Sequence, residues 1–201
     1  MFVVDWLVVF HFDSIRIMSL YGCQIIMNNN VYITGFSGSG KSTSGRELAL
    51  LLERDFVDMD SEIEKLHKQT IPDIFEEHGE VVFRGLETGL LTQISRKDGQ
   101  IVSTGGGVPT IPENVKIMKC TGKIVCLMAS VETLSKRISH HSNTAGNKAD
   151  RPMLYSDDQT ERIRDLLDIR KKSYSQANLL IDTEDKSPKM VAIEIAEVLE
   201  L

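Results

Sequence analysis

Short apolar runs alternate with longer segments of helical periodicity from residue 31 to the C-terminus. Residues 123–128 have a continuous apolar character, which is typical of a strand buried on both faces of a sheet. Five strands separated by helices predict an α/β fold with a doubly wound parallel sheet. The predicted strands are 31–34, 56–58, 100–103, 123–128 and 179–181. The predicted helices are 42–54, 61–67, 72–96, 131–139, 159–173 and a last one that begins with Ser187-Pro188. A polar loop is expected at 140–150.

A glycine-rich loop follows the first predicted strand. Residues 35–43 read Gly-Phe-Ser-Gly-Ser-Gly-Lys-Ser-Thr, a complete G-x-x-x-x-G-K-[ST] pattern between a strand and a helix. The glycines let successive N–H groups face inward around a polyphosphate, and the helix N-terminus adds a positive dipole end. Lys41 can reach the β- and γ-phosphates, and the Ser42 hydroxyl can bind Mg²⁺. The predicted nucleotide-binding residues of this loop are Gly38, Ser39, Gly40, Lys41, Ser42 and Thr43.

Further polar and glycine residues follow the next two strands. Asp58 and Asp60 end the second strand, and Gly105, Gly106 and Gly107 end the third. Ligands of a doubly wound sheet bind at the carboxyl ends of its strands. We therefore expect these segments to meet the phosphate loop at one edge of the sheet.

Size and charge limit the classes of protein that fit. The 201 residues suit one α/β domain, and the net charge of -6 argues against general affinity for nucleic acid. The cysteines Cys23, Cys120 and Cys126 are odd in number and lack the spacing of metal ligands, which suits a reducing cytoplasm. We expect a cytoplasmic monomer with a small-molecule substrate and with no nucleic-acid or membrane partner.

The first residues form a separate segment. Residues 1–12 are very apolar, but Asp5 interrupts them, they are too short to span a bilayer, and no basic segment precedes them. Met27 stands just before the first strand. We interpret residues 1–26 as a dispensable extension or a start codon assigned too early, and residues 27–201 as the folded domain.

An ordered set of motifs accompanies the phosphate loop. The loop continues as GKSTSGRELA, followed by DMDSEIE at 58–64, IFEEHGEVVFRGLE at 74–87, STGGG at 103–107, RPML at 151–154 and RKKSY at 170–174. This set resembles the shikimate kinase family over about residues 30–200. Lys172 stands where the family usually has proline, and Met59 replaces a usually small or polar residue.

The resemblance implies a fold and a reaction. The fold is that of a phosphate-loop NTPase, similar to the nucleoside monophosphate kinases, with a mobile lid at about 140–154. The reaction is transfer of the γ-phosphoryl group of ATP to the 3-hydroxyl of shikimate, in aromatic amino-acid biosynthesis. ATP and Mg²⁺ are the implied cofactors, with Ser42 holding the metal directly and Asp58 holding it through water.

The resemblance also assigns the acceptor side. Asp60 faces the acceptor hydroxyl and accepts its hydrogen bond and its proton; the alternative is that Asp60 caps the helix at 61–67. Guanidinium groups suit the shikimate carboxylate, and the motifs point to Arg84 and Arg170. Glu87 can orient Arg84 from one helical turn away, unless the two form only an exposed ion pair. The glycines at 105–107 let the backbone approach the ring hydroxyls, unless they are a flexible turn.

Four other residues receive an assignment, and three of them also have an alternative. Arg151 closes with the lid and neutralises the transferring phosphoryl group. Arg137 contacts the nucleotide or remains a surface residue. Phe75 and Phe83 are apolar walls for the ring or ordinary core residues.

Rival functions remain. Residues 147–150 match the N-K-x-D motif of GTPases, but they follow a polar loop and no D-x-x-G element precedes them, so we interpret the match as accidental. A gluconate-type kinase shares the phosphate loop but lacks the combination of the 79–87 and triple-glycine segments. A nucleoside monophosphate kinase is a third possibility, for which the sequence offers no base-recognition pattern.

Overall fold

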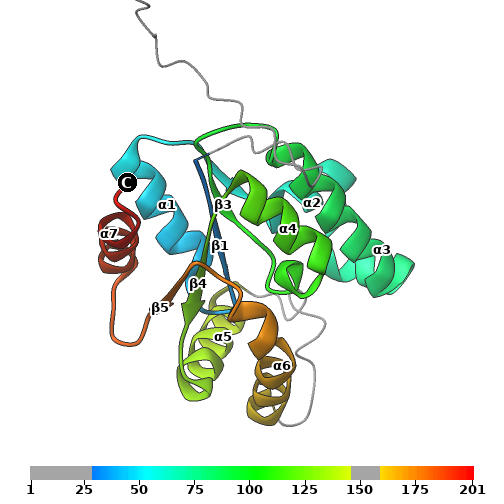
Figure 1. The fold of residues 1–201 in the computed structure, drawn as a ribbon. Coiled ribbons are helices and arrows are strands. Elements are labelled where there is room, and N and C mark those ends of the chain that lie inside the picture. The colour runs from blue at the N-terminus through cyan, green and yellow to red at the C-terminus, as the bar shows by residue number, and fades with distance from the viewer. Residues whose placement is uncertain (1–28, 146–158) are drawn as a thin grey trace, which may run out of the picture.

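The computed structural model describes residues 29–145 and 159–201, and these build one five-stranded sheet covered by helices (Figure 1). The strand order is β2-β3-β1-β4-β5, and every neighbouring pair is parallel. The strands are β1 (Asn30–Gly35), β2 (Phe56–Asp58), β3 (Ile101–Ser103), β4 (Gly122–Met128) and β5 (Leu179–Asp182). The predicted doubly wound parallel sheet is confirmed, with the strand before the phosphate loop at its centre.

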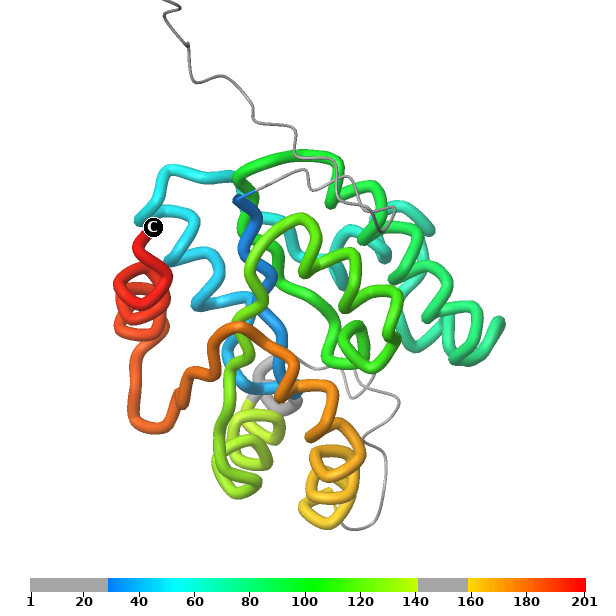
Figure 2. The backbone as a smooth tube through the Cα atoms, in the orientation of Figure 1, coloured from blue at the N-terminus to red at the C-terminus, as the bar shows by residue number. Residues whose placement is uncertain are grey.

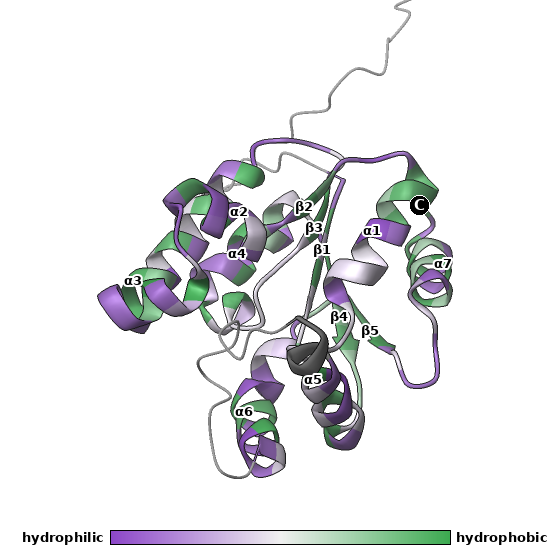
Figure 3. Ribbon diagram, turned by 180° about the vertical axis from the view of Figure 1, so that it is seen from behind, coloured by the Kyte–Doolittle hydropathy of each residue, from purple (hydrophilic) through white to green (hydrophobic). Residues whose placement is uncertain are grey.

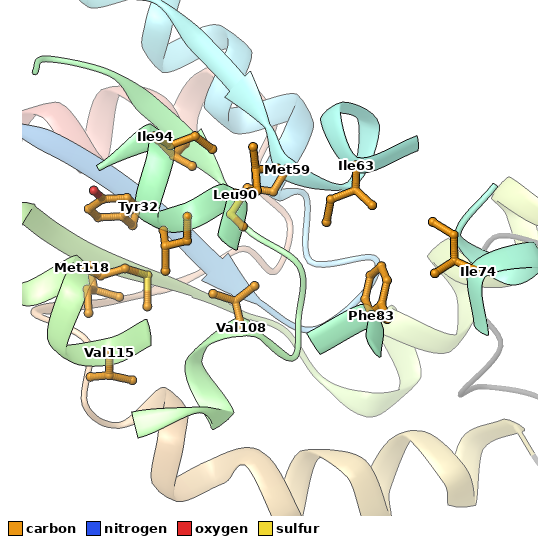
Figure 4. Close-up of a cluster of buried hydrophobic side chains, with 13 residues drawn as sticks. Tyr32, Met59, Ile63, Ile74, Phe83, Leu90, Ile94, Val108, Val115 and Met118 are labelled. Carbon is orange, nitrogen blue, oxygen red and sulfur yellow. The ribbon is translucent and has the colours of Figure 1, made fainter. Parts of the chain in front are cut away.

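The alternation of side chains along β1 divides the core into two layers. Val31 and Ile33 pack with α1 (Lys41–Leu52) and α7 (Pro188–Leu199), which lie next to each other on one face of the sheet (Figure 2). Tyr32 points to the opposite face and joins a cluster with side chains of α2 (Met59–His67), α3 (Ile71–Ile94) and α4 (Pro112–Thr121) (Figure 4). Successive residues of a strand face opposite ways, so the single central strand anchors both layers.

A third group of helices lies beyond one end of the sheet. The helices α5 (Val131–Ala145) and α6 (Gln159–Tyr174) pack against each other there (Figure 1). Phe36 and Cys126 bridge from the sheet to apolar side chains of these helices. The strand β4, which carries Cys126, is largely hydrophobic (Figure 3), and its residues 124–127 are buried, as expected for a parallel strand covered on both faces.

Local sequence explains where several helices begin. The Ser187 side chain accepts a hydrogen bond from the Met190 N–H and caps α7, as the Ser-Pro pair predicts. Thr70 and Asp73 form a reciprocal capping box at the start of α3. Within α3, Gly79 has a φ of 78° and interrupts the helical conformation, which most other residues could not do without strain.

The structure corrects two predicted helix boundaries and adds a helix that was not predicted. The helix α4, a single helix over 112–121, was not predicted, although Pro112 at its first turn and the spacing of Val115 and Met118 are helix signals. The helix α5 continues to residue 145, over the first part of the loop expected at 140–150, because no glycine or proline interrupts it before Gly146. The helix α2 begins at Met59, two residues before the predicted start.

Pairing of the central strands aligns the two glycine segments. Ile33 of β1 lies opposite Ser103 of β3, and the Thr104 N–H donates to the Ile33 carbonyl over 2.9 Å. The phosphate loop and the triple glycine therefore leave adjacent strands at the same level. Among the described residues, none of the helices has the length and apolar character needed to cross a membrane.

Candidate active site

The phosphate loop and the start of α1 form one wall of a pocket of about 590 Å³. Gly40 takes a left-handed conformation (φ 91°) at the N-terminal boundary of α1, which glycine adopts at little cost. The pocket is lined by all six loop residues that the sequence assigns to the nucleotide, together with Asp58, Asp60, Arg137, His140, Thr183 and others. A helix N-terminus and a curled loop supply N–H groups and a positive dipole, so this pocket suits a polyphosphate.

Lys41 and Ser42 point toward the strand ends from the first turn of α1. The Lys41 ammonium donates to the Phe36 carbonyl over 2.9 Å, within its own loop. The Ser42 hydroxyl lies 3.3 Å from the Ser103 hydroxyl at the end of β3. Ser103 also lies opposite Asp58 in the β2–β3 pair, so it stands between the two proposed metal ligands. Sequence reasoning missed Ser103, although its place just before the triple glycine was a usable signal.

The oxygen atoms near Ser42 fit a hard divalent cation. The Ser42 hydroxyl and the Asp58 carboxylate both line the pocket, and oxygen ligands suit Mg²⁺. The described residues hold no group of three or more His, Cys, Asp or Glu side chains arranged for a metal ion. A Mg²⁺ ion here would take its remaining ligands from water and phosphate oxygens, as Mg²⁺ commonly does.

The two aspartates after β2 have different surroundings. The Asp58 carboxylate accepts the Ser61 N–H over 3.4 Å and is the N-cap of α2. The alternative that Asp60 is this cap is therefore wrong, because α2 begins earlier than the sequence predicts. Burial raises the pKa of the Asp60 carboxyl to about 6, and Lys41 acts in the opposite direction.

Asp60 connects the pocket to the triple glycine. It lines the pocket, and a side-chain carbon placed on Gly105 would lie 3.0 Å from the Asp60 Oδ1 atom and would collide with Glu87. A side chain at Gly107 would collide with the Arg84 guanidinium. Glycine at these positions allows the backbone to pass close to three charged side chains.

Arg84 is held between two carboxylates of α3. Its Nη1 donates to Glu87 over 2.6 Å, while Nε and Nη2 both donate to Glu80 over 3.2 and 3.0 Å. The Glu87 side chain is only 1% exposed, so the alternative of an exposed ion pair is wrong. Burial raises the pKa of Glu87 to about 7 against the opposing effect of Arg84. The second oxygen of Glu87 has no hydrogen-bond partner among the described residues.

Arg170 approaches the same region from α6. It is 9% exposed, and its Nη1 would lie 3.3 Å from a side-chain carbon placed on Gly106. Tyr174 donates to the Gly106 carbonyl over 2.9 Å, and burial raises the pKa of its hydroxyl to about 12. The third helical group thus contacts the middle glycine, while α3 contacts the outer two.

Arg137 is fixed at the opposite end of the pocket. It donates to the carbonyl and the hydroxyl of Thr183 over 2.9 and 3.0 Å, and both residues line the pocket. The alternative of an unattached surface arginine does not describe it. Thr183 follows β5 directly, so its position at a strand end was the missed signal.

The remaining assigned residues lie in the core or outside the described ranges. Phe83 belongs to the cluster around Tyr32 (Figure 4). Phe75 packs against that cluster, and the rings of Phe75 and Phe83 lie 4.7 Å apart. Arg151, most of the expected lid and the N-K-x-D match at 147–150 lie outside the described residues.

Comparisons with known proteins agree on one family. A family model described as shikimate kinase matches residues 37–200. The shikimate kinase of Caldicellulosiruptor saccharolyticus is 41% identical over 84% of this chain and 94% of its own length. The structure of shikimate kinase from Acinetobacter baumannii in complex with shikimate superimposes with a TM-score of 0.79 at 36% identity, over 86% of this chain and 93% of that one. A gluconokinase from Sinorhizobium meliloti shares only the fold, with 15% identity and a TM-score of 0.52.

Proposed function

The chain belongs to the shikimate kinase family, and on that basis we propose that it phosphorylates the 3-hydroxyl of shikimate with ATP. The products are ADP and 3-phosphoshikimate, an intermediate of aromatic amino-acid biosynthesis. The observation that carries the proposal is the position of Asp60. It lines the polyphosphate pocket and lies beside the triple glycine that contacts Arg84, Glu87 and Arg170. One carboxylate thus stands at the junction of a donor site and an acceptor site.

The donor site is the pocket at the start of α1. The loop N–H groups and the α1 dipole bind the β- and γ-phosphates, and Lys41 neutralises them after leaving the Phe36 carbonyl. Ser42 would hold Mg²⁺ directly, and Asp58 would hold it through water. When bound, Mg²⁺ neutralises the charge that develops on the phosphate oxygens. Arg137 contacts the nucleotide from the β5 end of the pocket.

The acceptor site is the cluster around the triple glycine. The guanidinium groups of Arg84 and Arg170 bind the ring carboxylate, because planar donors match its two oxygens. Glu87 fixes the orientation of Arg84. The backbone at Gly105, Gly106 and Gly107 contacts the ring hydroxyls at close range.

Asp60 then completes the transfer. Its carboxylate accepts the proton of the 3-hydroxyl as that oxygen bonds to the γ-phosphorus, and the bond from the γ-phosphorus to the bridging oxygen of ADP breaks. With a pKa of about 6, the carboxyl is mostly ionised at neutral pH and close to the operating pH of a general base. Arg151, which lies outside the described residues, keeps its assignment of neutralising the transferring phosphoryl group.

An ADP-release assay with purified protein tests the function. We expect rapid turnover with shikimate and ATP, and background turnover with gluconate or with GTP in place of ATP. Faster turnover with gluconate would make gluconate the acceptor in place of shikimate. A preference for GTP would support the interpretation of residues 147–150 as a guanine-specificity motif.

Comparing the full chain with one that starts at Met27 tests whether residues 1–26 are dispensable, and loss of activity in the shorter chain would refute that interpretation.

A further inference from the structure

Phe36 belongs to the phosphate loop, but its side chain packs away from the pocket. The ring is 2% exposed and joins a cluster with side chains of α5 and α6, including Leu134, Ile163 and Tyr174. The residue occupies a variable position of the loop pattern, where the phosphate chemistry requires no particular side chain. Its ring therefore serves something other than the nucleotide.

The ring contacts the Arg170 guanidinium. The Arg170 Cζ atom lies 5.5 Å from the centre of the Phe36 ring, within the range of a cation–π contact. Arg170 also donates a hydrogen bond to the Tyr174 hydroxyl, which in turn donates to the Gly106 carbonyl over 2.9 Å. The guanidinium is thus held by an aromatic ring from the loop after β1 and by a hydroxyl one helical turn further along α6.

We propose that Phe36 and Tyr174 position Arg170 to bind the acceptor carboxylate, so that the phosphate loop contributes a side chain to acceptor recognition. A free arginine side chain loses rotamer entropy when it binds, and a prepositioned one loses less. The inference rests on the proposed function, because it assigns Arg170 to the shikimate carboxylate. Neither positioning residue contacts the substrate itself in this assignment.

Replacing the two side chains leaves the nucleotide contacts in place. Lys41 donates to the main-chain carbonyl of Phe36, which is kept in a Phe36→Leu variant. We expect Phe36→Leu to raise the KM for shikimate about 3- to 30-fold, with kcat and the KM for ATP changed less than twofold. Tyr174→Phe removes the hydroxyl from Arg170 and should raise the same KM about tenfold.

Two matched variants control for nonspecific damage. Phe56 also carries a cation–π contact, with Arg46 at 5.3 Å, and lies on β2 away from Arg170. Tyr32 also has a buried hydroxyl, hydrogen-bonded to Thr121 over 2.7 Å. Phe56→Leu and Tyr32→Phe should leave the KM for shikimate within twofold of the parent value. Thermal unfolding of all four variants identifies any that fail to fold.

An Arg170→Met background separates this inference from the proposed function. There we expect Phe36→Leu to change kcat/KM for shikimate less than twofold, because the residue that it positions is gone. If Arg170→Met lowers kcat/KM but Phe36→Leu and Tyr174→Phe do not, the positioning role is wrong and the proposed function stands. If Arg170→Met itself leaves kcat/KM unchanged, the assignment of Arg170 fails and the inference fails with it. If Phe36→Leu lowers kcat/KM equally in the parent protein and in the Arg170→Met variant, Phe36 does not act through Arg170.

Discussion

The donor pocket and the acceptor cluster are built in different ways. The phosphate-binding wall of the pocket consists of a contiguous loop and the first turn of α1, which line the pocket mainly with glycine and short polar side chains. The acceptor cluster consists of long charged side chains from α3 and α6 around a glycine turn. The phosphate-binding wall is local in sequence, whereas the acceptor cluster is assembled by the fold.

The difference has an electrostatic consequence. Charges in the acceptor cluster are withdrawn from water, and burial raises the pKa of both Asp60 and Glu87. Such groups cost stability in the empty protein and are useful once an anionic ligand and its counter-charges are in place. The acceptor cluster should therefore respond to conservative substitutions and to pH more strongly than the pocket.

Asp60→Asn is expected to have the largest effect. It removes the base at the junction of the two sites while keeping the side-chain shape, and kcat should fall about 10²- to 10⁴-fold. Steady-state turnover under saturating ATP and shikimate checks this. Near-normal turnover would show that Asp60 takes no part in the reaction, and the donor pocket and the acceptor cluster would then have no catalytic residue at their junction.

Stability should fall as the pH rises through 7. The folded-state pKa of Glu87, about 7, lies above its ordinary 4.5, so the folded protein holds a proton that the unfolded chain has released. This contribution is complete below pH 4.5 and is lost as the pH rises through 7, and it amounts to at most about 3 kcal/mol. Asp60 acts in the same direction, with a folded-state pKa of about 6.

Urea unfolding at pH 5 and pH 8.5 measures that loss. Glu87→Gln should flatten the pH dependence, whereas Glu80→Gln, on the exposed side of Arg84, should keep it. If the parent protein instead becomes more stable as the pH rises, ionisation of the buried Glu87 and Asp60 carboxyl groups does not destabilise the fold, and this description of the cluster is wrong.

Arg84→Lys sharpens the acceptor assignment. It keeps a positive charge next to Glu87 but loses the planar donor pair, whereas Arg84→Ala would leave Glu87 buried without its cation. The dissociation constant for shikimate should rise about 10- to 100-fold while that for ADP stays the same. Calorimetric titration with each ligand checks this, and parallel losses for both ligands would indicate damage to the fold.

Asp58→Asn separates the two roles of the helix cap. Asparagine caps helices as well as aspartate does, so the free energy of unfolding should change by less than about 0.5 kcal/mol. Loss of the carboxylate should raise the Mg²⁺ concentration needed for half-maximal activity about 10-fold. An unchanged Mg²⁺ requirement, with wild-type stability, would leave Asp58 only its structural role at the start of α2.

The sequence predicted the sheet and the family, but less of the geometry of the site. The fold class and the membership of the shikimate kinase family follow from contiguous patterns, which survive without tertiary context, and both are confirmed. The cap at Asp58 was missed because a shift of one or two residues in a helix start depends on packing that the pattern does not record. The helix α4 was missed although its sequence carries helix signals. The contact of Phe36 with Arg170 joins residues far apart in the chain, and nothing in the spacing of either one indicates the other.

The adjacency of β1 and β3 has a mechanical consequence. The phosphate loop follows β1, and the triple glycine follows the neighbouring strand β3. Paired strands lie only about 4.8 Å apart, and main-chain hydrogen bonds, such as the one from the Thr104 N–H to the Ile33 carbonyl, join these two. A hinge between donor and acceptor would have to break that ladder. The sheet thus keeps the phosphate loop and the triple glycine at a constant distance from each other. Any closure around the substrates has to come from movement of the surrounding helices and loops.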